Sequence, residues 1–269
     1  MPRIAVPFLV VLAVSVTAAC PFSPPAARAE GDKGTKGGVF PDVTDAAADE
    51  AKGLLAALTK AMEGPEEEKV VAALAPMVKK KSADFVPELK KLLVDRRDSV
   101  AAAAAEALGS QGDKGSATLL VKVVNADTRD KGVLRDPLLK AAAIEAVGRL
   151  GGSGAFEAVK KMADSLVREP EVRCRYAPKV ARACVRYFGI TKEKRSVSWL
   201  IDEVEKPNLR GAVLPSSPPA DHWKYRQDIW GEIRYEVVWA LKEITGKEME
   251  TETRWESWFN TEGKKAGYR

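Results

Sequence analysis

Three segments of the chain carry the same helical pattern, and this repetition limits the fold more than any other feature. In each segment one large aliphatic residue follows another after eight positions, with small or apolar residues between: Val100 and Leu108, Leu139 and Val147, Ile233 and Leu241. That spacing is typical of one face of an α-helix. Helices that recur at intervals of tens of residues predict a stack of hairpins, because a single hairpin cannot bury its own apolar face.

Runs of helical pattern alternate with short breaks at Gly and Pro over residues 45–262. These breaks recur about every 15–20 residues, which excludes a long coiled coil. We therefore expect an all-α protein, with Asp98 as the N-cap of one helix. The expected helix pairs are 45–62 with 65–81, 83–94 with 98–109, 115–125 with 136–150, 154–168 with 170–188, and 191–206 with 227–245.

The second helices of these pairs resemble those of HEAT repeats. Asp98-Ser99-Val100, Leu139-Lys140 and Glu232-Ile233-Arg234 each keep part of that family's helix start, and the intervals are 39 residues from Leu108 to Val147 and 38 from Val147 to Val185. The resemblance covers about residues 45–250. It implies a right-handed α–α superhelix, a HEAT-type solenoid of about five hairpins, whose usual role is protein–protein scaffolding.

The C-terminal region resembles the end of exported HEAT proteins from planctomycete-type bacteria. The resemblance rests on residues 240–246 followed by Arg254-Trp255-Glu256-Ser257-Trp258-Phe259. We expect a short capping helix over 251–262, with Thr251 or Thr253 as its N-cap, and a C-terminal tail over 263–269. Trp255, Trp258 and Phe259 are predicted to cap the last repeat, in which Trp230 and Trp239 are predicted to pack.

The N-terminus has the pattern of a secretory signal peptide. Arg3 precedes an apolar stretch over 4–19, and Ala27-Arg28-Ala29 places small residues before Glu30. We expect cleavage after Ala29 and an exported, periplasmic or secreted protein. Residues 17–20 also resemble a lipobox, so lipidation of Cys20 is the alternative. Residues 30–44 are rich in Gly and Lys and predict a flexible linker.

Composition restricts the partners that we expect. The net charge is +5, and removal of 1–29 takes away Arg3 and Arg28, leaving 41 basic residues against 38 acidic ones. The dense basic cluster at 79–81 suits a helix C-terminus better than a nucleic-acid site. No stretch after the signal peptide is long and apolar enough to span a membrane. We expect a monomer that binds a protein partner, does not bind nucleic acid and has no membrane span, with a lipid anchor at Cys20 as the alternative.

Cys174 and Cys184 are the cysteines that remain after cleavage. Ten residues of continuous helix span about 15 Å, which is too far for a disulfide. A break at Pro178 would leave a bridge open as an alternative. We expect two buried apolar side chains instead.

A Pro-rich insertion interrupts the repeats at 207–226, and it carries the residues that look most like a binding site. Tryptophan, tyrosine and arginine are the residue types enriched at interaction hot spots, and long loops on a rigid scaffold are often functional. The candidate interaction residues are Trp223, Tyr225, Arg226 and, on the following helix, Arg234.

The sequence gives little support for a catalytic function. His222 is the only histidine, and the chain lacks the phosphate-binding and nucleophile-elbow motifs. Iron-dependent HEAT-type hydroxylases need several His-Glu pairs, which are absent here. We therefore expect no metal, no cofactor and no catalytic residue. The function that we expect is an exported, non-catalytic scaffold that binds protein on its concave face; the alternatives are a small-molecule or glycan site formed by the loop aromatics, and an enzyme using Asp221, His222 or Glu232.

Overall fold

The computed structural model describes residues 45–126, 129–130, 133–134, 137–168, 177–207 and 220–269. All of them belong to the compact unit Val43–Arg269. The predicted signal peptide, the linker, Cys20, Cys174 and most of the insertion lie outside the described residues. A membrane-spanning helix is absent from the part of the chain that the structure describes, since no helix there combines the needed length with the needed hydropathy.

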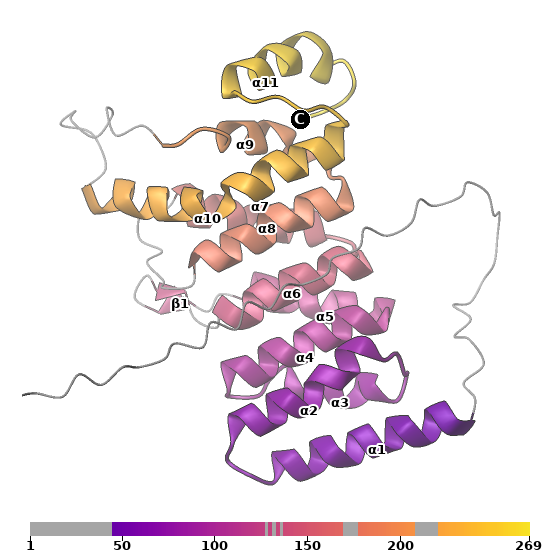
Figure 1. The fold of residues 1–269 in the computed structure, drawn as a ribbon. Coiled ribbons are helices and arrows are strands. Elements are labelled where there is room, and N and C mark those ends of the chain that lie inside the picture. Colours follow the sequence, from indigo (N-terminus) through magenta and orange to yellow (C-terminus); the bar gives the residue numbers. More distant parts are fainter. Residues whose placement is uncertain (1–44, 127–128, 131–132, 135–136, 169–176, 208–219) are drawn as a thin grey trace, which may run out of the picture. The chain divides into compact units, whose positions relative to one another are not determined.

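Helices dominate the described residues and pack as five consecutive pairs, which confirms the predicted all-α, HEAT-type solenoid (Figure 1). A short ladder joins β1 (Arg129–Asp130) to β2 (Val133–Leu134) in antiparallel register. The pairs are α1 (Asp45–Met62) with α2 (Glu67–Lys79), α3 (Phe85–Leu92) with α4 (Asp98–Gln111), α5 (Lys114–Asn125) with α6 (Pro137–Leu150), α7 (Ala155–Arg168) with α8 (Ala177–Thr191), and α9 (Val197–Asp202) with α10 (Ala220–Thr245).

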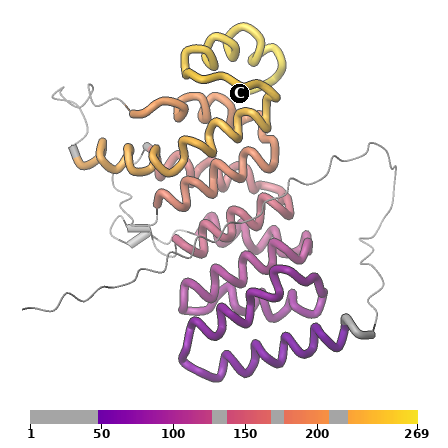
Figure 2. The backbone as a smooth tube through the Cα atoms, viewed as in Figure 1, coloured from indigo at the N-terminus to yellow at the C-terminus, as the bar shows by residue number. Residues whose placement is uncertain are grey.

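The second helices α2, α4, α6, α8 and α10 form one layer, in which each packs on the next (Figure 2). Glycines let these helices approach closely. A Cβ atom on Gly109 would lie 2.7 Å from Cα and Cβ of Ala146, and one on Gly148 would lie 3.4 Å from Cδ2 of Tyr187. Helix spacing this short requires the small residues that the alanine-rich sequence supplies.

The glycines also correct the predicted repeat register. Gly148 contacts the following second helix, and Gly189 on α8 does the same through Trp239 of α10. These two positions are 41 residues apart, so the equivalent of Val147 is Phe188 and not Val185. The predicted interval of 38 residues was wrong, because the alanine-rich helices offer several apolar residues within one turn and the sequence alone does not choose among them.

Two buried polar side chains close the C-terminal ends of α5 and α2. Lys140 is 1% exposed, and its Nζ donates hydrogen bonds to the carbonyls of Val123, Val124 and Ala126 at 3.1, 3.2 and 2.8 Å. Gln111 does the same for α2, since its Nε2 donates to the carbonyls of Met77 at 2.6 Å and Lys80 at 3.0 Å. Carbonyls in the last turn of a helix lack partners within the helix. Lys140 of α6 therefore closes α5 within its own hairpin, and Gln111 of α4 joins the second hairpin to the end of α2 in the first.

Three helix starts differ from the prediction. Arg97, not Asp98, is the N-cap of α4, and Asp98 lies in the first turn, where its charge suits the helix dipole. Helix α8 begins at Ala177 and places Pro178 in its first turn, where proline is tolerated. Helix α10 begins at Ala220, so the end of the predicted insertion is helical; this stretch follows the last proline and contains no helix breaker before Gly231.

The C-terminal capping helix forms as predicted. It is shorter than the expected 251–262, and the residues after it are hydrogen-bonded to the last repeat. Helix α11 (Glu252–Trp258) has Thr251 as its N-cap and continues into a π-helical turn, η3 (Phe259–Gly263). Trp255 is fully buried. The expected tail is held to the last repeat, because the backbone N–H of Arg269 donates to the Lys194 carbonyl at 3.1 Å and its carbonyl accepts from Ser198 N–H at 3.0 Å.

Candidate interaction surface

The repeat shows which side chains of the second-helix layer face outward. Each second helix begins its apolar stripe at an equivalent position: Val70, Val100, Leu139, Val180 and Ile233. Positions two residues later face away from the core and are occupied by Ala72, Ala102, Ala141, Arg182 and Tyr235. Positions six residues later are occupied by Pro76, Glu106, Glu145, Arg186 and Trp239. Along the layer this surface therefore changes from small and acidic side chains to cations and then to aromatics.

Helices α8 and α10 expose an aromatic patch, which we define as Ile190, Tyr235, Trp239 and Arg234. The exposed fractions of Ile190, Tyr235 and Trp239 are 37%, 71% and 39%, all high for such large apolar side chains. Arg234 extends this patch, because its guanidinium lies 4.5 Å from the ring centroid of Tyr235 and its Nη2 donates to the Tyr235 hydroxyl at 2.9 Å. Exposed aromatics stacked with arginine are typical of protein-binding hot spots.

Ion pairs hold the helices that carry the patch in place. Arg182 of α8 contacts Glu232 at 3.3 Å and Glu236 at 2.7 Å, both on α10. Arg186 contacts Glu145 of α6 at 3.9 Å. The two arginines and their three glutamate partners are all partly exposed, so each pair adds little stability. They fix the relative position of three neighbouring helices and leave the patch as a rigid surface.

The predicted site residues do not form one cluster. Trp223, Tyr225 and Arg226 lie on the first turns of α10, not in a loop, and all three are half-buried. Arg226 Nη2 contacts Glu203 Oε1 at 3.2 Å, in a pair whose side chains are only 15% and 5% exposed. This buried pair attaches α10 to the end of α9. Arg234 is the predicted residue that lies on the exposed surface.

His222 lies in the same turns and is 8% exposed. Burial, with a smaller effect of the Arg226 charge, lowers the pKa of His222 below its ordinary value. Glu232, an alternative residue for acid–base catalysis, pairs with Arg182. Among the described residues no group of three His, Cys, Asp or Glu side chains could hold a metal ion. Cys184 is a buried free thiol, and burial raises its pKa above the ordinary range.

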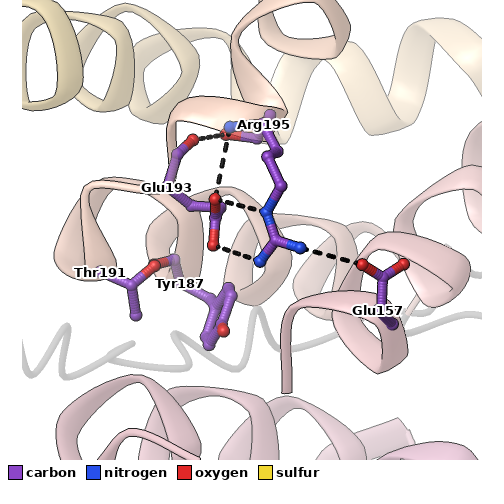
Figure 3. A network of polar contacts seen from close by, with 6 residues as sticks. Glu157, Tyr187, Thr191, Glu193 and Arg195 are labelled. Carbon is purple, nitrogen blue, oxygen red and sulfur yellow. Dashed lines mark hydrogen bonds and ion pairs between the residues drawn. The ribbon is translucent and has the colours of Figure 1, made fainter. Parts of the chain in front are cut away.

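A network of polar contacts joins α7, α8 and the turn before α9 (Figure 3). Arg195 forms a bidentate pair with Glu193, at 2.9 Å for both contacts, and reaches Glu157 of α7 at 3.1 Å. The bond to Arg195 lowers the pKa of Glu193, and burial raises the pKa of Tyr187 to about 12. Glu193 also caps the 3-10 helix η1 (Lys194–Ser196). We interpret this network as a structural junction between repeats.

Sequence reasoning missed Ile190, Tyr235 and Trp239 as surface residues. Trp239 was predicted to pack within the terminal repeat, and one side of it does rest on Gly189. The available signal was the repeat register, since Tyr235 and Trp239 occupy the positions at which earlier repeats place Ala102 and Glu106. Aromatic residues at two outward-facing positions of one helix indicate a binding surface.

Comparison with known families agrees with this architecture. The family model of HEAT repeats matches residues 51–135. The match and the stacked hairpins support a HEAT-repeat protein. No curated protein and no solved structure matches the chain. In this HEAT-type solenoid the matched segment runs from α1 to the end of the connection before α6, so the aromatic patch lies outside it.

Proposed function

We propose that the protein is a non-catalytic scaffold that binds another protein through the outward-facing side of its second-helix layer. HEAT repeats commonly mediate protein–protein interactions, in agreement with the expected role. The observation that carries the proposal is the aromatic patch, because Tyr235 is 71% exposed on a rigid helix and is stacked by Arg234. A solvent-exposed aromatic side chain of this size gains free energy when a partner buries it.

A photocrosslinking residue at position 235 tests this proposal in intact cells. We expect one defined protein to be crosslinked from position 235. Thr118 on α5 is an exposed control position in the first-helix layer, and the same residue there should give no such product. Equal products from both positions, or none from position 235, would contradict the proposed binding surface.

We further propose that the scaffold acts outside the cytoplasm, after removal of residues 1–29. The support is the order of Arg3, the apolar stretch 4–19 and the small residues Ala27 and Ala29. Mass spectrometry of the protein isolated from its own cells should find Glu30 as the first residue. An acylated Cys20 at the N-terminus would instead establish a lipid anchor, and an intact Met1 or Pro2 terminus would contradict export.

A further inference from the structure

Arg234 is an exposed cation of the aromatic patch, and aromatic rings rather than a carboxylate hold it in place. Its guanidinium lies 4.5 Å from the ring centroid of Tyr235 and 5.4 Å from that of Trp230. Trp230 is itself fixed, because its Nε1 donates to the Val204 carbonyl at 3.4 Å. One N–H group of Arg234 donates to the Tyr235 hydroxyl, and the other donors of this planar fork remain available to a partner.

The acidic residues nearest to Arg234 along α10 bind another arginine. Glu232 and Glu236 lie two positions before and after Arg234, and they contact Arg182 of α8 at 3.3 and 2.7 Å. Side chains two positions apart on a helix do not face each other, so these carboxylates do not reach Arg234. Among the described residues no Asp or Glu side chain forms an ion pair with Arg234. Its positive charge is therefore not balanced within the fold.

Other cations beside the patch differ from Arg234 in this respect. Lys192 contacts Glu243 at 3.8 Å, next to Ile190 at the end of α8. Lys242, one turn after Trp239, contacts Glu248 at 2.7 Å. The charge with which the patch attracts a partner is thus that of Arg234, and the charge complementary to it is a carboxylate.

We infer that a different protein binds the patch with an acidic segment, which places an Asp or Glu carboxylate on Arg234 and a large apolar side chain on Tyr235 and Trp239. The inference rests on the proposed function, since it names the chemistry of the partner for the same surface. A guanidinium can bind a carboxylate through two parallel hydrogen bonds, and rings that exclude water strengthen such a pair.

The position of the patch residues on α10 sets the spacing of these two groups. Trp239 follows Arg234 by five positions, which is about 7.5 Å along the helix axis. The acidic and the apolar residue of the partner should therefore lie roughly one to two helical turns apart, if the segment is a helix.

The photocrosslinking residue at position 235 identifies the segment, since mass spectrometry of the product gives the crosslinked peptide. We expect an Asp or Glu within about two helical turns of the crosslinked residue. In the purified complex, Arg234→Glu should weaken binding on the order of tenfold or more, and so should replacement of that acidic residue by arginine. The two reversals together should restore binding, because the charges exchange places across the interface.

Two further variants distinguish this ion pair from a general effect of surface charge. Arg234→Gln should make the dissociation constant less dependent on salt than in the wild type, because it removes a charge that salt screens. Arg96→Glu, at an exposed position of the turn before α4, is the matched control and should leave binding unchanged. Arg234 is exposed as well, and far-ultraviolet circular dichroism would confirm that its variants are folded.

The inference is overturned by a crosslinked peptide without an acidic residue in that span, by a product with a second copy of this chain, or by an affinity that Arg234→Glu does not change. A loss that reversal of the partner's acidic residue does not restore would also overturn it. If a different protein is crosslinked in these cases, the proposed function stands. The absence of any product from position 235 would overturn both.

Discussion

The indole ring of Trp239 lies directly on the backbone of Gly189, so that a Cβ atom on this glycine would be 2.4 Å from Cζ3 of the ring. The contact joins α10 to α8 and places the aromatic patch at a fixed position on the second-helix layer. Gly189 lies in the last turn of α8, and any residue with a Cβ atom there would collide with the indole ring. Its presence at position 189 therefore reflects the need for close approach.

Gly189→Ala should lower the free energy of unfolding by about 1–3 kcal/mol, because the added methyl group must displace the indole ring. Gly231 on α10 is a matched control: it is exposed, and a Cβ atom there would contact nothing within 4 Å. Gly231→Ala should raise the free energy of unfolding by about 0.4–1 kcal/mol. Urea denaturation followed by circular dichroism measures both changes, and equal effects would show that Trp239 does not require Gly189.

Lys140→Met should destabilise the fold by about 1–3 kcal/mol, since it leaves three carbonyls at the end of α5, that of Val124 buried, without their ammonium donor. Methionine keeps most of the aliphatic volume, so lost packing does not explain the effect. Lys122→Met, at an exposed position of α5, should change stability by less than about 0.5 kcal/mol. Thermal unfolding of the two variants distinguishes the loss of the Lys140 hydrogen bonds from a general effect of replacing lysine by methionine.

Stability should fall as the pH drops below about 6.5, in part because of His222. Burial holds its pKa in the folded state below that value. Between the two pKa values the unfolded chain binds a proton that the folded chain does not, so unfolding becomes easier as the pH falls. The neighbouring charges, Arg226 and Glu203, are already paired with each other.

His222→Gln should remove the contribution of His222 to this pH dependence. The free energy of unfolding of the variant should therefore change less between about pH 7 and pH 5 than that of the wild type. Urea midpoints measured across that range provide the comparison. A profile for the variant that is parallel to that of the wild type would show that His222 does not contribute.

Trp255→Ala should cost about 3–5 kcal/mol, because the side chain is fully buried where α11 closes the last repeat. Its Nε1 also donates to the Met249 carbonyl at 3.1 Å. Tyr235→Ala, which removes an exposed aromatic, should leave stability nearly unchanged. Chemical denaturation of both variants separates an aromatic residue that caps the fold from one that is available for binding.

Periodicity was sufficient to predict the helical pairs, since the eight-residue spacing reflects burial of one helix face, and the cap residues Trp255 and Trp258 are buried as expected. The register of α8 was not predictable, because its apolar residues permit two alignments. The junction at Arg195 was missed because Glu157 is 38 residues away in sequence. The start of α10 was placed late because aromatics and cations at 221–226 were interpreted as a loop.

The most direct test of the scaffold account is recovery of a bound protein from intact cells by the wild-type chain and by a variant lacking the patch. The variant combines Arg234→Ala with Tyr235→Ala. The control is Val94→Ala, which shortens an apolar side chain that is 85% exposed in the turn between α3 and α4. The account predicts that the wild type and Val94→Ala retain the same partner and that the double variant loses at least nine-tenths of it, on the order of tenfold. Undiminished recovery by the double variant would contradict it.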